Sequence, residues 1–152
     1  MLEERHLQPN RLFWFVALFL MLWSAAYGSM LFYTFVLASP EQLASIVEDR
    51  NHKDAYADYV RQFSVFSIAI NVSIATTRFL GELTLLMRKS WSVLFFSISL
   101  ALFGVTLIRG FIFGNAAEVM GPSHIFIEII MLTLSVFAVV FAIIMKRKGV
   151  LT

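Results

Sequence analysis

The chain contains four long apolar stretches, and their length limits most strongly what it can fold into. They cover residues 12–38, 60–87, 91–113 and 122–145. Each is long enough to cross about 30 Å of hydrocarbon as an α-helix, which takes about 20 residues. Backbone N–H and C=O groups in lipid need partners within the chain, so helices are the expected form. The stretches predict an all-α integral membrane four-helix bundle, with residues 1–152 forming a single transmembrane domain.

The composition agrees with a lipid environment. Of 152 residues, 59% are hydrophobic and 14% are charged, whereas soluble domains average about 45–50% and about 25%. The absence of Cys excludes thiol catalysis, thiolate metal sites and covalently attached haem. The net charge is only +2 and the basic residues are dispersed, so nucleic acid is not an expected partner.

The first stretch has an alternative interpretation as a cleaved signal peptide. Residues 36–38 (Val-Leu-Ala) resemble a small-residue cleavage site. However, the apolar run is much longer than the roughly 7–15 residues of a signal peptide, and its flank mixes Glu3 and Glu4 with Arg5 and Arg11. We therefore expect this helix to be retained in the protein.

The basic residues predict the orientation of the bundle. Seven of the 12 Lys and Arg residues lie before the first stretch, between the second and third, and after the fourth: Arg5, Arg11, Arg88, Lys89, Lys146, Arg147 and Lys148. Residues 39–61 instead carry five acids against three bases. By the positive-inside rule both termini are cytoplasmic, and residues 39–59 form an outer loop.

The second stretch carries polar residues within an apolar segment. Asn71, Arg78 and Glu82 lie on one narrow helical face. Arg78 lies about 13 Å from the end of the stretch, at about 1.5 Å per residue, and Glu82 follows at a spacing where helical side chains meet. Because a charge at the bilayer centre costs at least about 2.5 kcal/mol, we expect Arg78 and Glu82 to form an ion pair that faces protein.

A second set of ionisable residues lies near the outer ends of the last two stretches. We expect Arg109 to pair with Glu128, and His124 shares the helical face of Glu128. A single His is too few for a metal site, because zinc takes about three or four protein ligands. These residues and the Asn71 face have two interpretations, a solute path gated by ion pairs or structural pairs that hold helices together.

Catalysis has little support in the sequence. The chain shows no Ser-His-Asp arrangement, Gly-rich phosphate loop or HExxH motif. His6 and His52 lie outside the apolar stretches, which excludes a haem held by two His residues within the membrane. We therefore expect no enzyme activity and no cofactor.

Several short segments resemble a group of small bacterial four-span inner-membrane proteins. The segments are FLGELTLLMRKSW at residues 79–91, the pair Ser99-Leu100, EVMGPS at residues 118–123 and the proline-led outer loop. Such proteins often carry the label "sugar transporter", so the resemblance implies a location in the bacterial inner membrane and a transport role. Arg78 and Glu82 depart from the apolar pattern of that group, and the resemblance assigns no binding residues.

Two functions remain open. The first is a permease subunit for a small, sugar-like solute or an ion, working as a homo-oligomer because four helices enclose little volume. The second is a non-catalytic accessory or assembly subunit of a larger membrane complex. The polar face around Arg78 and Glu82 favours the first. The small residues Ala69, Ser73, Thr77 and Gly81, which allow close helix packing, fit both.

Overall fold

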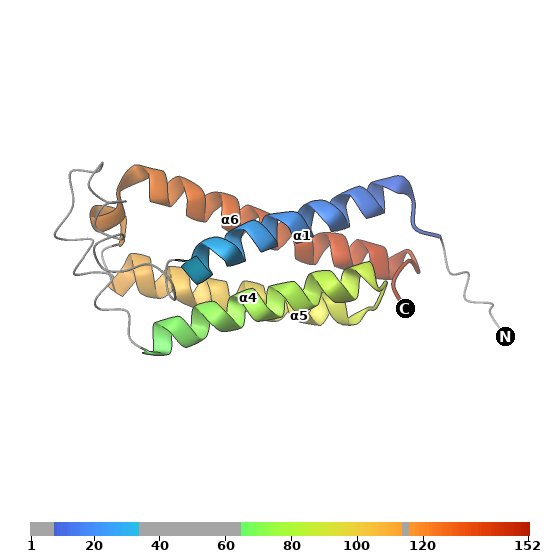
Figure 1. Ribbon diagram of the computed structural model, residues 1–152, viewed down its shortest axis with the longest axis horizontal. Coiled ribbons are helices and arrows are strands. Elements are labelled where there is room, and N and C mark those ends of the chain that lie inside the picture. Colours follow the sequence, from blue (N-terminus) through green and yellow to red (C-terminus); the bar gives the residue numbers. More distant parts are fainter. Residues whose placement is uncertain (1–7, 34–64, 114–115) are drawn as a thin grey trace.

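The computed structural model describes residues 8–33, 65–113 and 116–152, and these residues are mostly helical (Figure 1). The helices are α1 (Arg11–Phe32), α4 (Val65–Leu86), α5 (Trp91–Ile108) and α6 (Ala116–Arg147). A short π-helix, η2 (Arg109–Phe113), continues α5. The all-α prediction is confirmed for this part of the chain. The expected outer loop, residues 39–59, lies outside the described residues, as do the adjoining ends of the first two apolar stretches.

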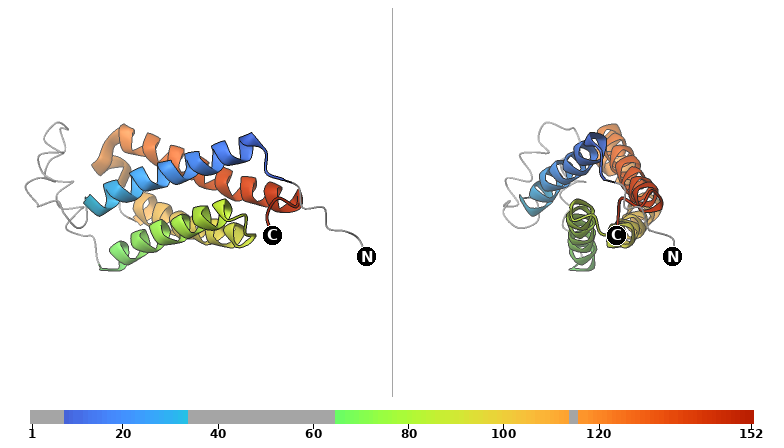
Figure 2. Two further views of the ribbon diagram at one scale, coloured as in Figure 1. Left: turned by 45° about the vertical axis from the view of Figure 1, so that its right-hand side comes forward. Right: turned by 90° about the vertical axis from the view of Figure 1, so that its right-hand side faces the viewer.

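The four α-helices alternate in direction and surround a common axis (Figures 1 and 2). Helix α4 packs along α5, α1 packs against α4, and α6 packs against α5. Phe13 of α1 stacks on Phe141 of α6, with ring centroids 6.0 Å apart and an interplanar angle of 24°. This contact joins the first and last helices, so that the bundle is closed near the start of α1.

Three helical segments in the described ranges are long and apolar enough to cross a membrane. They are Arg11–Met30, Trp91–Ile112 and Ile125–Arg147. Large apolar side chains on these helices face outward, among them Leu22 and Ile112, which are 71% and 66% exposed. An outward apolar surface of this kind fits contact with lipid and is unusual for a soluble protein. Helix α4 does not belong to this apolar set, and it is the helix that carries Arg78 and Glu82.

One end of the bundle holds the start of α1, the turn between α4 and α5, and the end of α6. We call it the basic end, because its described residues include a set of basic side chains: Arg11, Arg88, Lys89, Lys146, Arg147 and Lys148. Helix α6 ends at Arg147, two residues before Gly149, whose φ of 69° suits glycine. The N–H of Val150 bonds Met145 O at 3.0 Å and closes the last turn. The chain then turns back toward the axis of the bundle, where its end lies in the end-on view of Figure 2.

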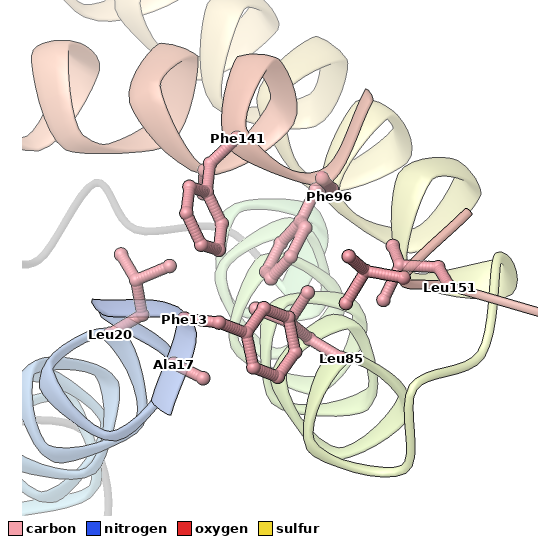
Figure 3. Packing of buried hydrophobic residues seen from close by; sticks show 10 residues of the cluster. Phe13, Ala17, Leu20, Leu85, Phe96, Phe141 and Leu151 are labelled. Atoms are coloured by element: carbon pink, nitrogen blue, oxygen red, sulfur yellow. The ribbon is translucent and has the colours of Figure 1, made fainter. Parts of the chain in front are cut away.

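Two apolar clusters lie along the inside of the bundle. The basic-end cluster collects side chains from all four helices and from the residues after α6 (Figure 3): Phe13, Ala17, Leu20, Leu85, Phe96, Ala138, Phe141, Ala142, Val150 and Leu151. The distal cluster has three buried members, Ile74, Phe103 and Met131, with Trp23 and Tyr27 packed against them.

Helices α4 and α5 approach closely at Gly81. A Cβ atom on Gly81 would lie 2.7 Å from the ring of Phe96, which is closer than packed carbon atoms come. The expectation that a small residue here allows close packing is therefore confirmed. Ala69 and Ser73, which share its helical spacing, are exposed.

Candidate functional site

The centre of the candidate site is an ion pair on α4. Arg78 Nε lies 3.6 Å from Glu82 Oε1, one helical turn away. Arg78 is 4% exposed and Glu82 is 1% exposed, so both face the interior of the bundle. The predicted Arg78–Glu82 pair is therefore present, and it faces protein.

Two serines from other helices complete a polar cluster around this pair. Ser24 of α1 donates its hydroxyl hydrogen to Glu82 Oε1. Arg78 Nη1 donates to Ser135 Oγ of α6 at 3.3 Å, and the Ser135 hydroxyl donates to Met131 O at 2.7 Å. We call Ser24, Arg78, Glu82 and Ser135 the polar cluster. Its hydrogen bonds connect three helices that lie far apart in the sequence.

The cluster retains unused hydrogen-bonding capacity. Arg78 Nη2 and Glu82 Oε2 are buried and have no hydrogen-bond partner among the residues that the structure describes. Leaving a buried charged group partly unsatisfied costs free energy, typically about 1–3 kcal/mol or more. The cluster therefore keeps one donor, on Arg78, and one acceptor, on Glu82, that a further polar group could use.

The polar cluster lies between the two apolar clusters. On α1, Ser24 falls between Leu20 of the basic-end cluster and Tyr27 beside the distal cluster. On α4, Arg78 and Glu82 likewise fall between Ile74 and Leu85. The same order holds on α6, where Met131, Ser135 and Ala138 follow one another. Apolar side chains thus separate the polar cluster from both ends of the bundle.

A groove between α1 and α4 reaches the polar cluster from the side. Its volume is about 680 Å³, and small or polar residues line much of it, including Ser24, Gly28, Ser29 and Thr76. Ser24 is both a wall of the groove and the hydrogen-bond donor to Glu82. The groove therefore reaches Ser24, the residue that bonds the carboxylate, while Glu82 itself stays buried behind it.

Two other predicted site residues, Asn71 and Glu128, lie on α4 and α6 outside the polar cluster. Asn71 is half-buried on α4, about two turns from Arg78 toward the distal end. Glu128 is half-buried on α6 and interacts electrostatically with Tyr27, which also interacts with Arg78. His124 belongs to α6, but its side chain lies outside the part of the chain that the structure describes.

Arg109 contacts an aromatic ring on another helix. It is exposed, and its guanidinium carbon lies 5.4 Å from the centroid of the Phe66 ring on α4. A cation over an aromatic face gains about 0.5–1 kcal/mol at an exposed position. The Arg109–Glu128 pair stays a prediction.

Ser24 and Ser135 are the site residues that the sequence prediction left out. Ser24 is a hydroxyl in the middle of a long apolar helix, and Ser135 lies on the same face of α6 as Glu128. Both are weak signals, because serine in a membrane helix often bonds only its own backbone. Ser97 of α5, for example, donates to Val93 O at 2.7 Å and is exposed.

The fold and the site together have the features of a membrane protein with a polar centre. No protein-family model, curated protein or solved structure matches this chain. Within the described ranges, no three His, Cys, Asp or Glu side chains gather in a way that could hold a metal ion. The polar cluster, the groove and the two apolar clusters are therefore the features of the protein that bear on its function.

Proposed function

We propose that the protein is a permease subunit for a small polar solute in the bacterial inner membrane. The observation that carries the proposal is the buried polar cluster, which has an unused donor and an unused acceptor and lies between two apolar clusters. Ionisable groups inside a membrane protein are expensive to keep and usually mark a path or a site. In this proposal the apolar clusters are the closed gates of an occluded state, and the polar cluster is the solute site.

The proposal requires α4 to be a fourth crossing. Helix α4 has 22 residues, enough to span the hydrocarbon, and it packs along α5, which is one of the three apolar helices. Its two charged residues face inward, where the other helices shield them from lipid. Four crossings then place both termini on the same side, and the basic end favours the cytoplasm for that side.

The solute class follows from the charges of the polar cluster. The positive charge of Arg78 and the negative charge of Glu82 cancel, which favours a neutral polar solute over an ion. The resemblance of residues 79–91 to proteins labelled "sugar transporter" agrees with a neutral, sugar-like solute. The groove between α1 and α4 opens on the side of the bundle, so a second copy of the chain would complete the wall of the path.

An accessory subunit is the second candidate, and the same hydrogen bonds favour it in a different way. Arg78 and Glu82 link α1, α4 and α6, which would hold the bundle rigid without any transport. Purification in a mild detergent separates the two candidates. The permease proposal expects a homo-oligomer that remains intact alone, whereas an accessory subunit would co-purify with a larger complex.

Solute uptake by reconstituted vesicles tests the proposal directly. Vesicles with the purified protein should take up a neutral polyol or sugar faster than empty vesicles, and Glu82→Gln should reduce that rate at least tenfold. Thr133→Val is the matched control, because Thr133 is exposed on α6 and bonds only Ile129 O of its own helix, at 2.8 Å. Uptake at the empty-vesicle rate across sugars, polyols and cations would overturn the proposal.

A further inference from the structure

The basic end brings together charged residues that are distant in the sequence. The turn between α4 and α5 supplies Arg88 and Lys89, and the end of α6 supplies residues 146–148. Backbone hydrogen bonds hold the two segments together: Ser90 N bonds Thr152 O at 2.8 Å, and Thr152 N bonds Arg88 O at 2.7 Å. Arg88 Nε also donates to Val150 O at 3.1 Å. The last residues therefore fix the end of α6 beside the turn.

Most of these charges are exposed and face away from the cluster that anchors the segment. Lys89, Lys146, Arg147 and Lys148 are all exposed, while Val150 and Leu151 are each 5% exposed within the basic-end cluster. The only Asp or Glu side chain among the described residues near this end is that of Glu82, which is buried with Arg78. The surface is thus positive, with no Asp or Glu side chain beside it in the described part of the chain.

Exposed tryptophans lie at the same end. Trp91 opens α5 next to the turn and is 61% exposed, and Trp14 near the start of α1 is 40% exposed. Tryptophan is enriched where the hydrocarbon meets the lipid headgroups. The two rings therefore place the basic side chains at the depth of the headgroups.

We infer that the turn between α4 and α5 and the end of α6 form a binding surface for the headgroups of anionic phospholipids. Basic residues next to a membrane attract anionic headgroups with about 1 kcal/mol per Lys or Arg, which is about fivefold in affinity. The apolar sides of α5 and α6 adjoin this surface and take the acyl chains. The lipid bridges two segments that otherwise meet through the residues after α6. This surface is independent of the solute site.

Unfolding temperature in detergent, measured while lipid is added, tests the inference without any transport assay. Phosphatidylglycerol should raise the unfolding temperature, because a ligand that binds only the folded state stabilises it. Phosphatidylcholine and inorganic phosphate should not. Lys89→Gln and Lys148→Gln should each raise, about fivefold, the phosphatidylglycerol concentration that is needed for the same increase in unfolding temperature. Arg109→Gln, an exposed basic residue toward the other end, should leave that concentration dependence unchanged.

Three results would overturn the inference. Equal stabilisation by phosphatidylcholine would show that only the acyl chains matter, and equal stabilisation by inorganic phosphate would indicate a site for free anions. An effect of Arg109→Gln as large as that of Lys89→Gln would mean that positive charge anywhere on the protein is sufficient. The two lysines make no described hydrogen bond through their side chains, so these variants are expected to fold.

Discussion

Ser24 of α1 and Arg78 of α4 share one carboxylate oxygen, Oε1 of Glu82. The hydroxyl of Ser24 donates to this oxygen from a neighbouring helix, and Arg78 lies beside it one turn along the same helix. Glu82 therefore cannot be removed without freeing groups on two helices. The second carboxylate oxygen, Oε2, stays open for a hydrogen bond. The relationship makes Glu82 both a structural junction and the acceptor of the proposed solute site.

The first prediction concerns the coupling of Arg78 and Glu82. Arg78→Leu or Glu82→Leu alone leaves one buried charge without its partner, which typically costs about 3–5 kcal/mol. The double variant removes both charges and should be markedly more stable than either single variant. Unfolding temperatures of the four proteins, followed by tryptophan fluorescence, provide the comparison. Losses that simply add in the double variant would show that the two residues do not interact.

The second prediction concerns the close approach of α4 and α5. Gly81→Ala should destabilise the protein by about 1–3 kcal/mol, because the added methyl group meets the ring of Phe96. Gly104→Ala is the control, since a Cβ there has no atom within 4 Å. Thermal unfolding of the two variants checks the difference. Equal behaviour of Gly81→Ala and Gly104→Ala would contradict the tight packing at Phe96.

The third prediction concerns the turn after α4. Arg88 has a φ of 58°, which costs a residue with a side chain about 1 kcal/mol relative to glycine. Arg88→Ala and Arg88→Gly both lose the bond from Nε to Val150 O, but only glycine relieves the backbone. The glycine variant should therefore be the more stable by about 1 kcal/mol. An alanine variant as stable as the glycine variant would show that the backbone there is relaxed.

The sequence alone is sufficient to predict the class of fold and the Arg78–Glu82 ion pair, and the physical reasons for the two differ. Apolar length requires a helix in lipid wherever it occurs, so the helices could be predicted without knowing their neighbours. The pair could be predicted because Arg78 and Glu82 lie on one helix at a fixed spacing. Both inferences use only information within a single segment.

The partners from other helices could not be predicted in the same way. Helices α1 and α5 are apolar on nearly all sides, so their sequences do not show which face turns inward. The sequence of α1 therefore does not assign Ser24 to Glu82, and the sequence of α6 does not say which helix faces Ser135. Arg109 shows the same dependence, because its contact with the Phe66 ring of α4 could not be predicted from the sequence of its own helix. Contacts between helices depend on their rotation, which three-dimensional packing decides.

The fourth prediction tests the gate at the basic end. Phe13 and Leu151 converge in the basic-end cluster (Figure 3), so Phe13→Ala together with Leu151→Ala should open a path from that end toward the polar cluster. The rate of solute uptake into vesicles should then be higher, and it should level off less with increasing solute concentration than in the unchanged protein. Phe15→Ala is the control, because Phe15 is 70% exposed on the outer side of α1. Identical uptake in the double variant and the control would show that the basic-end cluster does not act as a gate.

The proposed function requires a polar molecule to reach Ser24 and Glu82 through the groove between α1 and α4. Because the chain has no Cys, single cysteines can be placed in the intact protein without background labelling. Thr76 lines the groove, whereas Thr133 is exposed on α6. Thr76 lies two residues before Arg78 on α4, and Thr133 lies two residues before Ser135 on α6. Arg78 and Ser135 are hydrogen-bonded, and the two helices run in the same direction (Figure 1), so Thr76 and Thr133 lie at a similar depth in the membrane.

The most direct measurement is the rate at which a charged, membrane-impermeant thiol reagent modifies Thr76→Cys and Thr133→Cys in sealed vesicles. Water in the groove should let Thr76→Cys react at least tenfold faster than Thr133→Cys, and a transported solute should slow that reaction. Equal, negligible rates at both positions would show that lipid fills the groove. The Arg78–Glu82 pair would then only hold the helices together, which would contradict the proposed solute site.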